Sequence, residues 1–491
     1  MIEGDIQARR AGLLLHLSSL PGPGETGDMG SEARHFVDFL QVSGMSVWQM
    51  LPIGPTQFDG SPYQSSSMHA GNPRFISLEP LVEEGWLPAE ALAPDSISDA
   101  EKRRLLLRAW REFQRSADPG RHDELRAFVE RQPWLPEYAL FRALHEEQGS
   151  CWWEWPKPLR DRDPDTLRRV RERLTQAIGY IQFEQHLFFR QWQALKAYAN
   201  ERGVWLFGDM PIFVAHDSAE VWTHRDMFML DAAGHPEMVA GVPPDYFSAT
   251  GQRWGNPLYR WEAMEADGFS FWEERMRTQL QLFDLVRIDH FRGFESFWAI
   301  PAEDDNAING HWMSAPGDAL FERLHQIYDP LPLVAEDLGI ITPEVEALRL
   351  KYGLPGMKIL QFAFSGESSN PYLPFRHERN SVVYTGTHDN DTTRGWYLSL
   401  DDGQRRYVDE YLGRSREVMP WPLIRAALAS RSRLAILPMQ DVLGLDSSGR
   451  MNLPGTTEGN WRWRFDWAQV EEDLALRLYQ RVEMYGRLAP R

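Results

Sequence analysis

The chain has 491 residues, enough for one large elaborated domain or for two to four ordinary ones. Its 52 Lys and Arg residues are outnumbered by 71 Asp and Glu residues, and the net charge of −19 argues against a nucleic-acid partner, which would need clustered basic residues. The single cysteine, Cys151, excludes an intrachain disulfide and a cysteine-based zinc cluster.

The amino-terminal residues contain no apolar stretch typical of a secretory signal, and no run of about 18 apolar residues predicts a membrane span. We therefore expect a cytoplasmic protein without a membrane partner.

The first 52 residues predict a strand, a helix and a second strand. An apolar run at 12–17 enters a loop, and Phe36, Phe39 and Leu40 then lie at helical spacing before Gly44. A second apolar run follows at 47–52. Two strands joined through a helix by short links are expected to pair in parallel.

Six further apolar runs predict strands at 204–209, 285–289, 333–336, 357–362, 382–387 and 434–439. Together with the first two they make eight, the number that a (β/α)8 TIM barrel, an α/β fold, needs.

Two of the gaps between these strands are too long to be bare loops, at about 150 and about 75 residues. We expect inserted, mainly helical subdomains on the catalytic face, at about 55–200 and about 212–280. Helical patterns at 101–115 and 167–202 lie in the first gap. The chain is thus predicted to be a single catalytic barrel domain over residues 1–491.

Acids stand at the ends of four predicted strands: Asp209, Asp289, Glu336 and Asp389. In a closed barrel these ends converge, so we expect a carboxylate cluster in which one acid stays protonated. Arg287 lies two residues before Asp289, hence on the same face of its strand, and is expected to neutralise part of the charge. Taken alone, this pair is equally well explained as a structural ion pair.

Two carboxyl groups, one ionised as a nucleophile and one neutral as an acid, are what retaining glycosyl chemistry requires. A divalent metal is the competing use of such a cluster. Arg287, His388 and His290 place positive or donor groups among the acids, and no calcium-loop or His-x-x-x-His spacing occurs, so no metal is expected. The 20 Trp, 15 Tyr and 25 Phe residues suit sugar rings, although most such rings fill a core.

Seven motifs occur in order along the chain. They are Asp-Gly-Ser-Pro-Tyr-Gln at 59–64, His-Ala-Gly-Asn-Pro at 69–73, Gly-Val-Pro-Pro-Asp-Tyr-Phe-Ser at 241–248, Gly-Gln-Arg-Trp-Gly-Asn-Pro-Leu-Tyr at 251–259, Arg-Ile-Asp-His-Phe-Arg-Gly at 287–293, Ala-Glu-Asp-Leu-Gly at 335–339 and Thr-Gly-Thr-His-Asp-Asn-Asp-Thr at 385–392. This series resembles the amylomaltases, a family of 4-α-glucanotransferases or disproportionating enzymes related to the α-amylase clan. The resemblance covers about residue 10 to about residue 465.

The resemblance implies roles at matching positions. Asp289 matches the family nucleophile, Glu336 the general acid/base, and Asp389 the acid that holds sugar hydroxyls at the reacting ring. Arg287 is expected to keep the nucleophile ionised. Substrate-binding roles are implied for Arg287, His388, Asp209, Tyr63, His290, Tyr246, Phe247, Trp254 and Asn460. No cofactor is expected.

The resemblance thus predicts transfer of a segment of an α-1,4-glucan to the 4-hydroxyl of an acceptor glucose or glucan, through a covalent β-glycosyl-enzyme intermediate. The expected partners are α-1,4-glucans, maltooligosaccharides and glucose. A plain α-glucan hydrolase would use the same carboxylates, and a non-catalytic carbohydrate-binding protein is the alternative outside enzymes. Retention predicts that the carboxyls of Asp289 and Glu336 lie roughly 5 to 6 Å apart, and the charge of Asp289 is expected to raise the pKa of Glu336.

Overall fold

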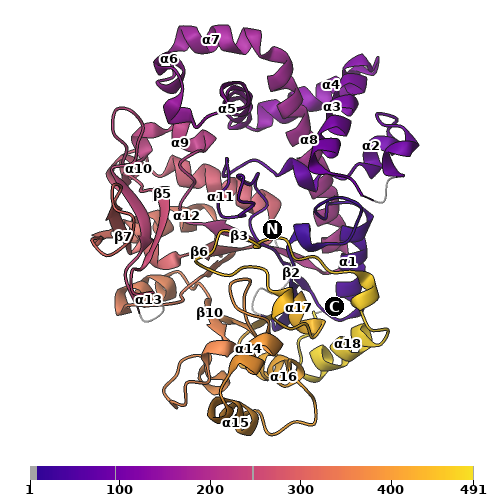
Figure 1. The fold of residues 1–491 in the computed structure, drawn as a ribbon, viewed down its shortest axis with the longest axis vertical. Coiled ribbons are helices and arrows are strands. Elements are labelled where there is room, and N and C mark those ends of the chain that lie inside the picture. Colours follow the sequence, from indigo (N-terminus) through magenta and orange to yellow (C-terminus); the bar gives the residue numbers. More distant parts are fainter. Residues whose placement is uncertain (1–7, 94–95, 246–247, 490–491) are drawn as a thin grey trace.

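A closed barrel of parallel strands forms the centre of the protein, seen in a computed structural model that describes residues 8–93, 96–245 and 248–489 (Figure 1). Within these residues eight strands pair in the order β10-β11-β12-β1-β2-β3-β6-β9. The ring closes where the Ala335 N–H donates to the Pro355 carbonyl at 2.9 Å, just before β10. The strands are β1 (Arg10–Leu14), β2 (Val47–Gln49), β3 (Trp205–Pro211), β6 (Leu285–Asp289), β9 (Leu333–Ala335), β10 (Gly356–Ile359), β11 (Ser381–Tyr384) and β12 (Leu434–Pro438). The predicted TIM barrel is confirmed.

Alternate side chains of each barrel strand serve two different cores. In β6, Leu285 packs with Phe207 and Tyr384 in the barrel interior, whereas Val286 and Ile288 belong to the larger core under the helices. Because side chains alternate along β6, Arg287 and Asp289 share the inward face with Leu285, and both point toward the inside of the barrel, at the end where the strand closes.

Amphipathic helices cover the barrel (Figure 1). They include α1 (Ser31–Val42), α8 (Thr175–Glu201), α11 (Ser270–Leu282), α12 (Gly317–Ile327), α13 (Pro343–Lys351), α14 (Thr393–Ser399), α15 (Asp402–Tyr411), α16 (Trp421–Ala429), α17 (Met439–Val442) and α18 (Leu474–Met484). As predicted, Phe36, Phe39 and Leu40 are buried in α1, and Gly44 follows the helix with a φ of 72°.

The alternation of strands and helices fails between β10 and β11. Every residue of this connection is described, and it forms two short 3-10 turns, η7 (Leu360–Phe362) and η8 (Pro374–Arg376), in place of a covering α-helix. The strand predicted at 357–362 is therefore too long, because its apolar pattern continues into the η7 turn.

Helices predominate between β2 and β3 and gather at the top of Figure 1: α2 (Glu79–Glu83), α3 (Asp99–Arg115), α4 (Pro119–Arg131), α5 (Leu135–Gln148), α6 (Lys157–Arg160) and α7 (Pro164–Arg173), followed by α8. The pattern at 101–115 lies within α3. The pattern at 167–202 is divided between two helices, since the chain leaves helical geometry at Leu174, with φ of −96° and ψ of 16°.

A second, antiparallel sheet lies beside the barrel, in the order β5-β4-β7-β8. Its strands are β4 (Met238–Val242), β5 (Gln252–Pro257), β7 (Ser296–Pro301) and β8 (His311–Ser314), and the short helices α9 (Ala219–Thr223) and α10 (Trp261–Ala266) flank β4 and β5 in sequence. The sequence does not predict this sheet. Two of its strands, β4 and β5, lie in the connection after β3, and the other two, β7 and β8, lie in the connection after β6. The sheet places Trp254 and Trp312 on the cleft described below.

Candidate active site

A cleft of about 590 Å³ opens at the carboxyl ends of the barrel strands. Among the predicted site residues, those that line it are Asp289, Glu336, Asp389, Arg287, His388, Tyr63, His290, Trp254 and Asn460. Asp209 lies buried beneath it. Tyr246 and Phe247 fall outside the described residues. The strand ends therefore converge as a closed barrel requires.

Arg287 joins two of the acids from the inner face of β6. Its Nη1 donates to both carboxylate oxygens of Asp209 at 2.7 Å, and its Nη2 donates to Oδ1 of Asp289 at 2.7 Å. Arg287 and Asp209 are buried, but the side chain of Asp289 keeps 30% of its surface exposed. Arg287 is thus a structural ion-pair partner for Asp209 and also the group that holds Asp289 at the cleft surface.

A chain of polar contacts continues from Asp209 across the cleft floor. The Tyr63 hydroxyl donates to Oδ2 of Asp209 at 2.8 Å and lies 3.0 Å from Nε2 of His388. Burial and the charge of Asp209 raise the pKa of Tyr63 well above its ordinary value, so the phenol stays neutral. Burial also raises the pKa of Asp209, and the charge of Arg287 opposes that shift.

Asp389 ends this chain, with Oδ2 at 3.2 Å from Nε2 of His388. Burial alone would raise the pKa of Asp389, but the charge of His388 and hydrogen bonds from His388 and Asn452 lower it below its ordinary value. For His388, burial disfavours the cation, yet the adjacent Asp389 raises its pKa overall. Since 44% of the Asp389 side chain is exposed, this carboxylate can reach a ligand in the cleft.

Glu336 is held by backbone groups on both oxygens. The His290 N–H donates to Oε2 at 2.7 Å and the Leu338 N–H donates to Oε1 at 3.0 Å. Burial raises the pKa of Glu336 to about 7, the charge of Asp289 adds to the rise, and the charge of Arg287 opposes it. The sequence predicts that the charge of Asp289 raises the pKa of Glu336. That charge does contribute, but burial is the larger cause. Glu336 can hold a proton near neutral pH.

His290 follows Asp289 in a left-handed conformation, with φ of 55° and ψ of 50°. Such a backbone costs about 1 kcal/mol or more in a residue other than glycine, and here it accompanies the N–H bond to Glu336. The ring of His290 packs edge-on against Trp254, with centroids 4.8 Å apart. Burial lowers the pKa of His290 to about 4, and its buried Nε2 has no hydrogen-bond partner among the described residues. The imidazole of His290 is therefore neutral at pH 7.

The loop after β12 supplies two groups that the sequence does not predict. Asn452 Nδ2 donates to Oδ1 of Asp389 at 2.6 Å, and Arg450 Nη2 donates to the carbonyl of Asp389 at 2.7 Å. Neither residue belongs to an apolar pattern or to a motif of the resemblance. Trp461, from the same loop, also lines the cleft, with its ring centroid 6.0 Å from those of Tyr63 and His388.

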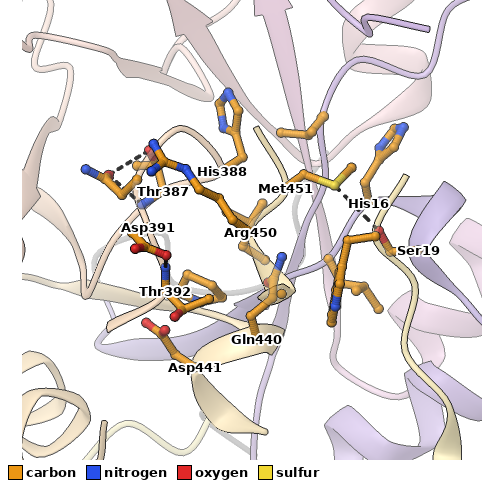
Figure 2. A pocket seen from close by; sticks show the side chains of 17 residues that line it. His16, Ser19, Thr387, His388, Asp391, Thr392, Gln440, Asp441, Arg450 and Met451 are labelled. Atoms are coloured by element: carbon orange, nitrogen blue, oxygen red, sulfur yellow. Dashed lines mark hydrogen bonds between the residues drawn. The ribbon is translucent and has the colours of Figure 1, made fainter. Parts of the chain in front are cut away.

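Asp441 anchors the segment that carries His388 and Asp389. Its Oδ2 accepts from the hydroxyls of Thr385 and Thr393 at 2.6 Å, and its Oδ1 accepts from the Thr393 N–H at 2.7 Å. Both ends of the 385–393 segment are thus tied to α17. Figure 2 shows Asp441 and His388 around a small cavity of about 30 Å³ on the inner side of this segment.

Asn460 lines the cleft, but its amide makes hydrogen bonds within its own loop. Its Oδ1 accepts from the Leu453 N–H at 2.9 Å, and its Nδ2 donates to the Thr456 carbonyl at 2.9 Å. A direct contact with substrate stays a prediction for this residue. Among the described residues, no group of three or more His, Cys, Asp and Glu side chains is arranged to hold a metal ion.

A family model described as 4-alpha-glucanotransferase matches residues 15–469. The chain belongs to the 4-alpha-glucanotransferase family. The 4-alpha-glucanotransferase of Thermus thermophilus is 49% identical over 98% of this chain and 99% of its own, and that of Synechocystis is 48% identical over 98% and 99%. The solved amylomaltase of Streptococcus agalactiae superimposes with a TM-score of 0.95 at 35% identity, over 98% of this chain and 99% of that one.

Membership of the 4-alpha-glucanotransferase family confirms the predicted resemblance to amylomaltases and the predicted class of enzyme. It favours the glucanotransferase over the hydrolase and the non-catalytic binding protein. No helix among the described residues combines the length and the apolar character that crossing a bilayer requires.

Proposed function

We propose that this 4-alpha-glucanotransferase moves a segment of an α-1,4-glucan to the 4-hydroxyl of an acceptor glucose or glucan by a retaining double displacement. The observation that carries the proposal is the contrast between two acids of one cleft. The Arg287 guanidinium donates to Asp289 at 2.7 Å, whereas Glu336 accepts hydrogen bonds from two backbone N–H groups and has its pKa raised to about 7. Such a contrast supports Asp289 as the nucleophile and Glu336 as the acid.

In the first step, Glu336 donates its proton to the glycosidic oxygen while a carboxylate oxygen of Asp289 attacks C1. The bond from C1 to the glycosidic oxygen breaks, and the leaving saccharide departs with the proton from Glu336. A β-glycosyl ester of Asp289 remains. Esterification removes the negative charge of Asp289, which had helped to raise the pKa of Glu336. The pKa of Glu336 therefore falls when a base is needed.

In the second step, the Glu336 carboxylate takes the proton of the acceptor 4-hydroxyl, whose oxygen attacks C1 as the bond to Asp289 breaks. The new glycosidic bond has the α configuration of the donor. We assign Asp389, His388 and Tyr63 to binding the hydroxyls of the reacting glucose, because they line the cleft and form one connected polar chain. Asp209, predicted to bind the same glucose, is instead buried beneath them and holds Tyr63 and Arg287 in place. The Streptococcus agalactiae amylomaltase, solved in complex with acarbose, supports a saccharide as the ligand.

Incubation with maltotriose tests this function. Transfer yields glucose together with a ladder of longer oligosaccharides, because each cleavage passes its glycosyl unit to another sugar. Hydrolysis would instead yield maltose and glucose in equal amounts. The second pattern would contradict the proposed transfer, and unchanged maltotriose would contradict cleavage altogether.

A further inference from the structure

Two large apolar side chains form a wall of the cleft that the two steps above do not use. Trp312 of β8 and Ile340 of the loop after β9 both line the cleft. Trp312 keeps 41% of its surface exposed and Ile340 keeps 60%, although both are large and apolar. Exposed apolar side chains that gather in a polar-rimmed cleft mark a ligand-binding surface.

Arg292 ties the two residues of this wall together. Its guanidinium carbon lies 4.0 Å from the centroid of the Trp312 ring, and its Nη1 donates to the Ile340 carbonyl. Arg292 belongs to the short turn η6 (Phe291–Phe294), which starts two residues after Asp289. Trp298 packs edge-on against Trp312, with centroids 5.2 Å apart. The wall is thus braced in advance by the same turn that follows the nucleophile.

The position of the apolar wall near Glu336 indicates which sugar the wall would contact. The Leu338 N–H donates to Glu336, so the loop that leads to Ile340 begins at the acid/base. Tyr63, His388 and Asp389 form a polar chain that is connected to Asp289 through Asp209 and Arg287. Because Glu336 acts on the oxygen that joins the reacting glucose to the next sugar, that next sugar lies on the Glu336 side of the cleft.

We propose that Trp312 and Ile340 form the site for the acceptor glucose, and that Trp312 determines how strongly an acceptor sugar competes with water for the glycosyl-enzyme. This inference rests on the proposed function. A pyranose ring presents an apolar face of C–H groups that suits an indole, whereas water gains nothing from it. Loss of the ring should therefore weaken acceptor binding and leave the attack of Asp289 on the donor intact.

The test uses 4′-deoxy-α-maltosyl fluoride as donor, which has no terminal 4-hydroxyl and cannot act as an acceptor, and glucose as acceptor. Fluoride release then reports the first step and oligosaccharide products report the second. Trp312→Ala should raise the acceptor KM about tenfold, the loss expected for one aromatic contact. The share of hydrolysis product should rise, and fluoride release without acceptor should stay at the wild-type rate. Trp312→Phe, which retains a ring, should recover most of the acceptor affinity.

Ile308→Ala is the matched control, because Ile308 is 52% exposed on the connection from β7 to β8 but does not line the cleft. It should change neither the acceptor KM nor the hydrolysis share. Wild-type values of both in Trp312→Ala would overturn the inference while the proposed function stands. Failure of the unsubstituted enzyme to transfer maltosyl groups to glucose would overturn the proposed function and this inference with it.

Discussion

Glu336 and Asp389 line the same cleft, yet their surroundings shift their pKa values in opposite directions. Burial dominates at Glu336, and the charge of Arg287 and two backbone hydrogen bonds offset it only in part. At Asp389, His388 and Asn452 favour the carboxylate strongly enough to outweigh burial. Two carboxyl groups of one cleft therefore differ in how readily they ionise, through what each one contacts.

The pKa of Glu336 predicts the alkaline limb of activity. As the proton donor, Glu336 must be protonated in the first step, so kcat/KM for maltotriose should fall as pH rises through about 7. With α-maltosyl fluoride, whose leaving group needs little protonation, this limb should be absent from fluoride release. Parallel pH profiles measured with the two donors would contradict the assignment of Glu336.

Asn452 is expected to position Asp389. Asn452→Ala removes the hydrogen bond to Oδ1 and should lower kcat/KM by about tenfold, as is usual for a bond to a charged group. Asn452→Asp should place a like charge there, raise the pKa of Asp389 and move the acidic limb of the pH profile upward. Asn309→Asp adds the same charge at an exposed position away from the cleft and should leave the profile unchanged. An unmoved acidic limb in Asn452→Asp would exclude this role.

The barrel strands could be predicted because a buried parallel strand is a short apolar run, and the acids could be found because they stand where these runs end. The limits predicted for β6, residues 285–289, are those of the structure. The second sheet escapes prediction because β8 is largely exposed and β5, with the sequence Gln-Arg-Trp-Gly-Asn-Pro, shows no apolar alternation. The break at Leu174 carries no Gly or Pro to mark it.

The residues of the active site could likewise be predicted only where a local sequence pattern marks them. Asp289, Glu336 and Asp389 can be found because they end strands or stand in motifs. Asn452 and Asp441 reach the cluster only through the loop and turn after β12, and no local pattern shows that this segment folds back onto Asp389. Tertiary contacts of this kind become visible only in the folded chain.

Closure of the barrel between β9 and β10 depends on close packing of Gly356 against Asp337. The Met357 N–H donates to Oδ1 of Asp337 at 2.6 Å, and a Cβ added at Gly356 would lie 2.1 Å from Oδ2. Gly356→Ala should therefore lower the free energy of unfolding by about 1–3 kcal/mol, measured by denaturant titration. In an Asp337→Ala background the same change should cost less, because the clashing carboxylate is gone. Additive losses would contradict this account of the closure.

The whole molecule buries acids away from the cleft as well, and Glu220 is one of them. It is 5% exposed, accepts a hydrogen bond from the Ser67 hydroxyl at 2.7 Å, and has its pKa raised to about 7 by burial. Since its folded pKa exceeds its unfolded value of about 4.5, its contribution to stability is complete below pH 4.5 and is lost as pH rises through about 7.

Glu220→Gln should therefore flatten the pH dependence of stability. Ionising this one buried group costs the native enzyme about 3 kcal/mol between pH 4.5 and 7. The variant should lack that part of the slope when the free energy of unfolding is measured across this range. Glu458→Gln, at an exposed position, serves as the control. Equal slopes in Glu220→Gln and the wild type would show that Glu220 is ionised throughout.

Asp289 is the proposed nucleophile, and the decisive experiment is to trap the covalent intermediate on it. Glu336→Gln supplied with α-maltosyl fluoride can complete the first step without an acid but lacks a base for the second. The intact protein should therefore gain the mass of one maltosyl group, and peptide mapping should place it on Asp289. Azide, which needs no base, should release it as an α-maltosyl azide. Absence of an adduct, or an adduct on another residue, would show that Asp289 is not the nucleophile.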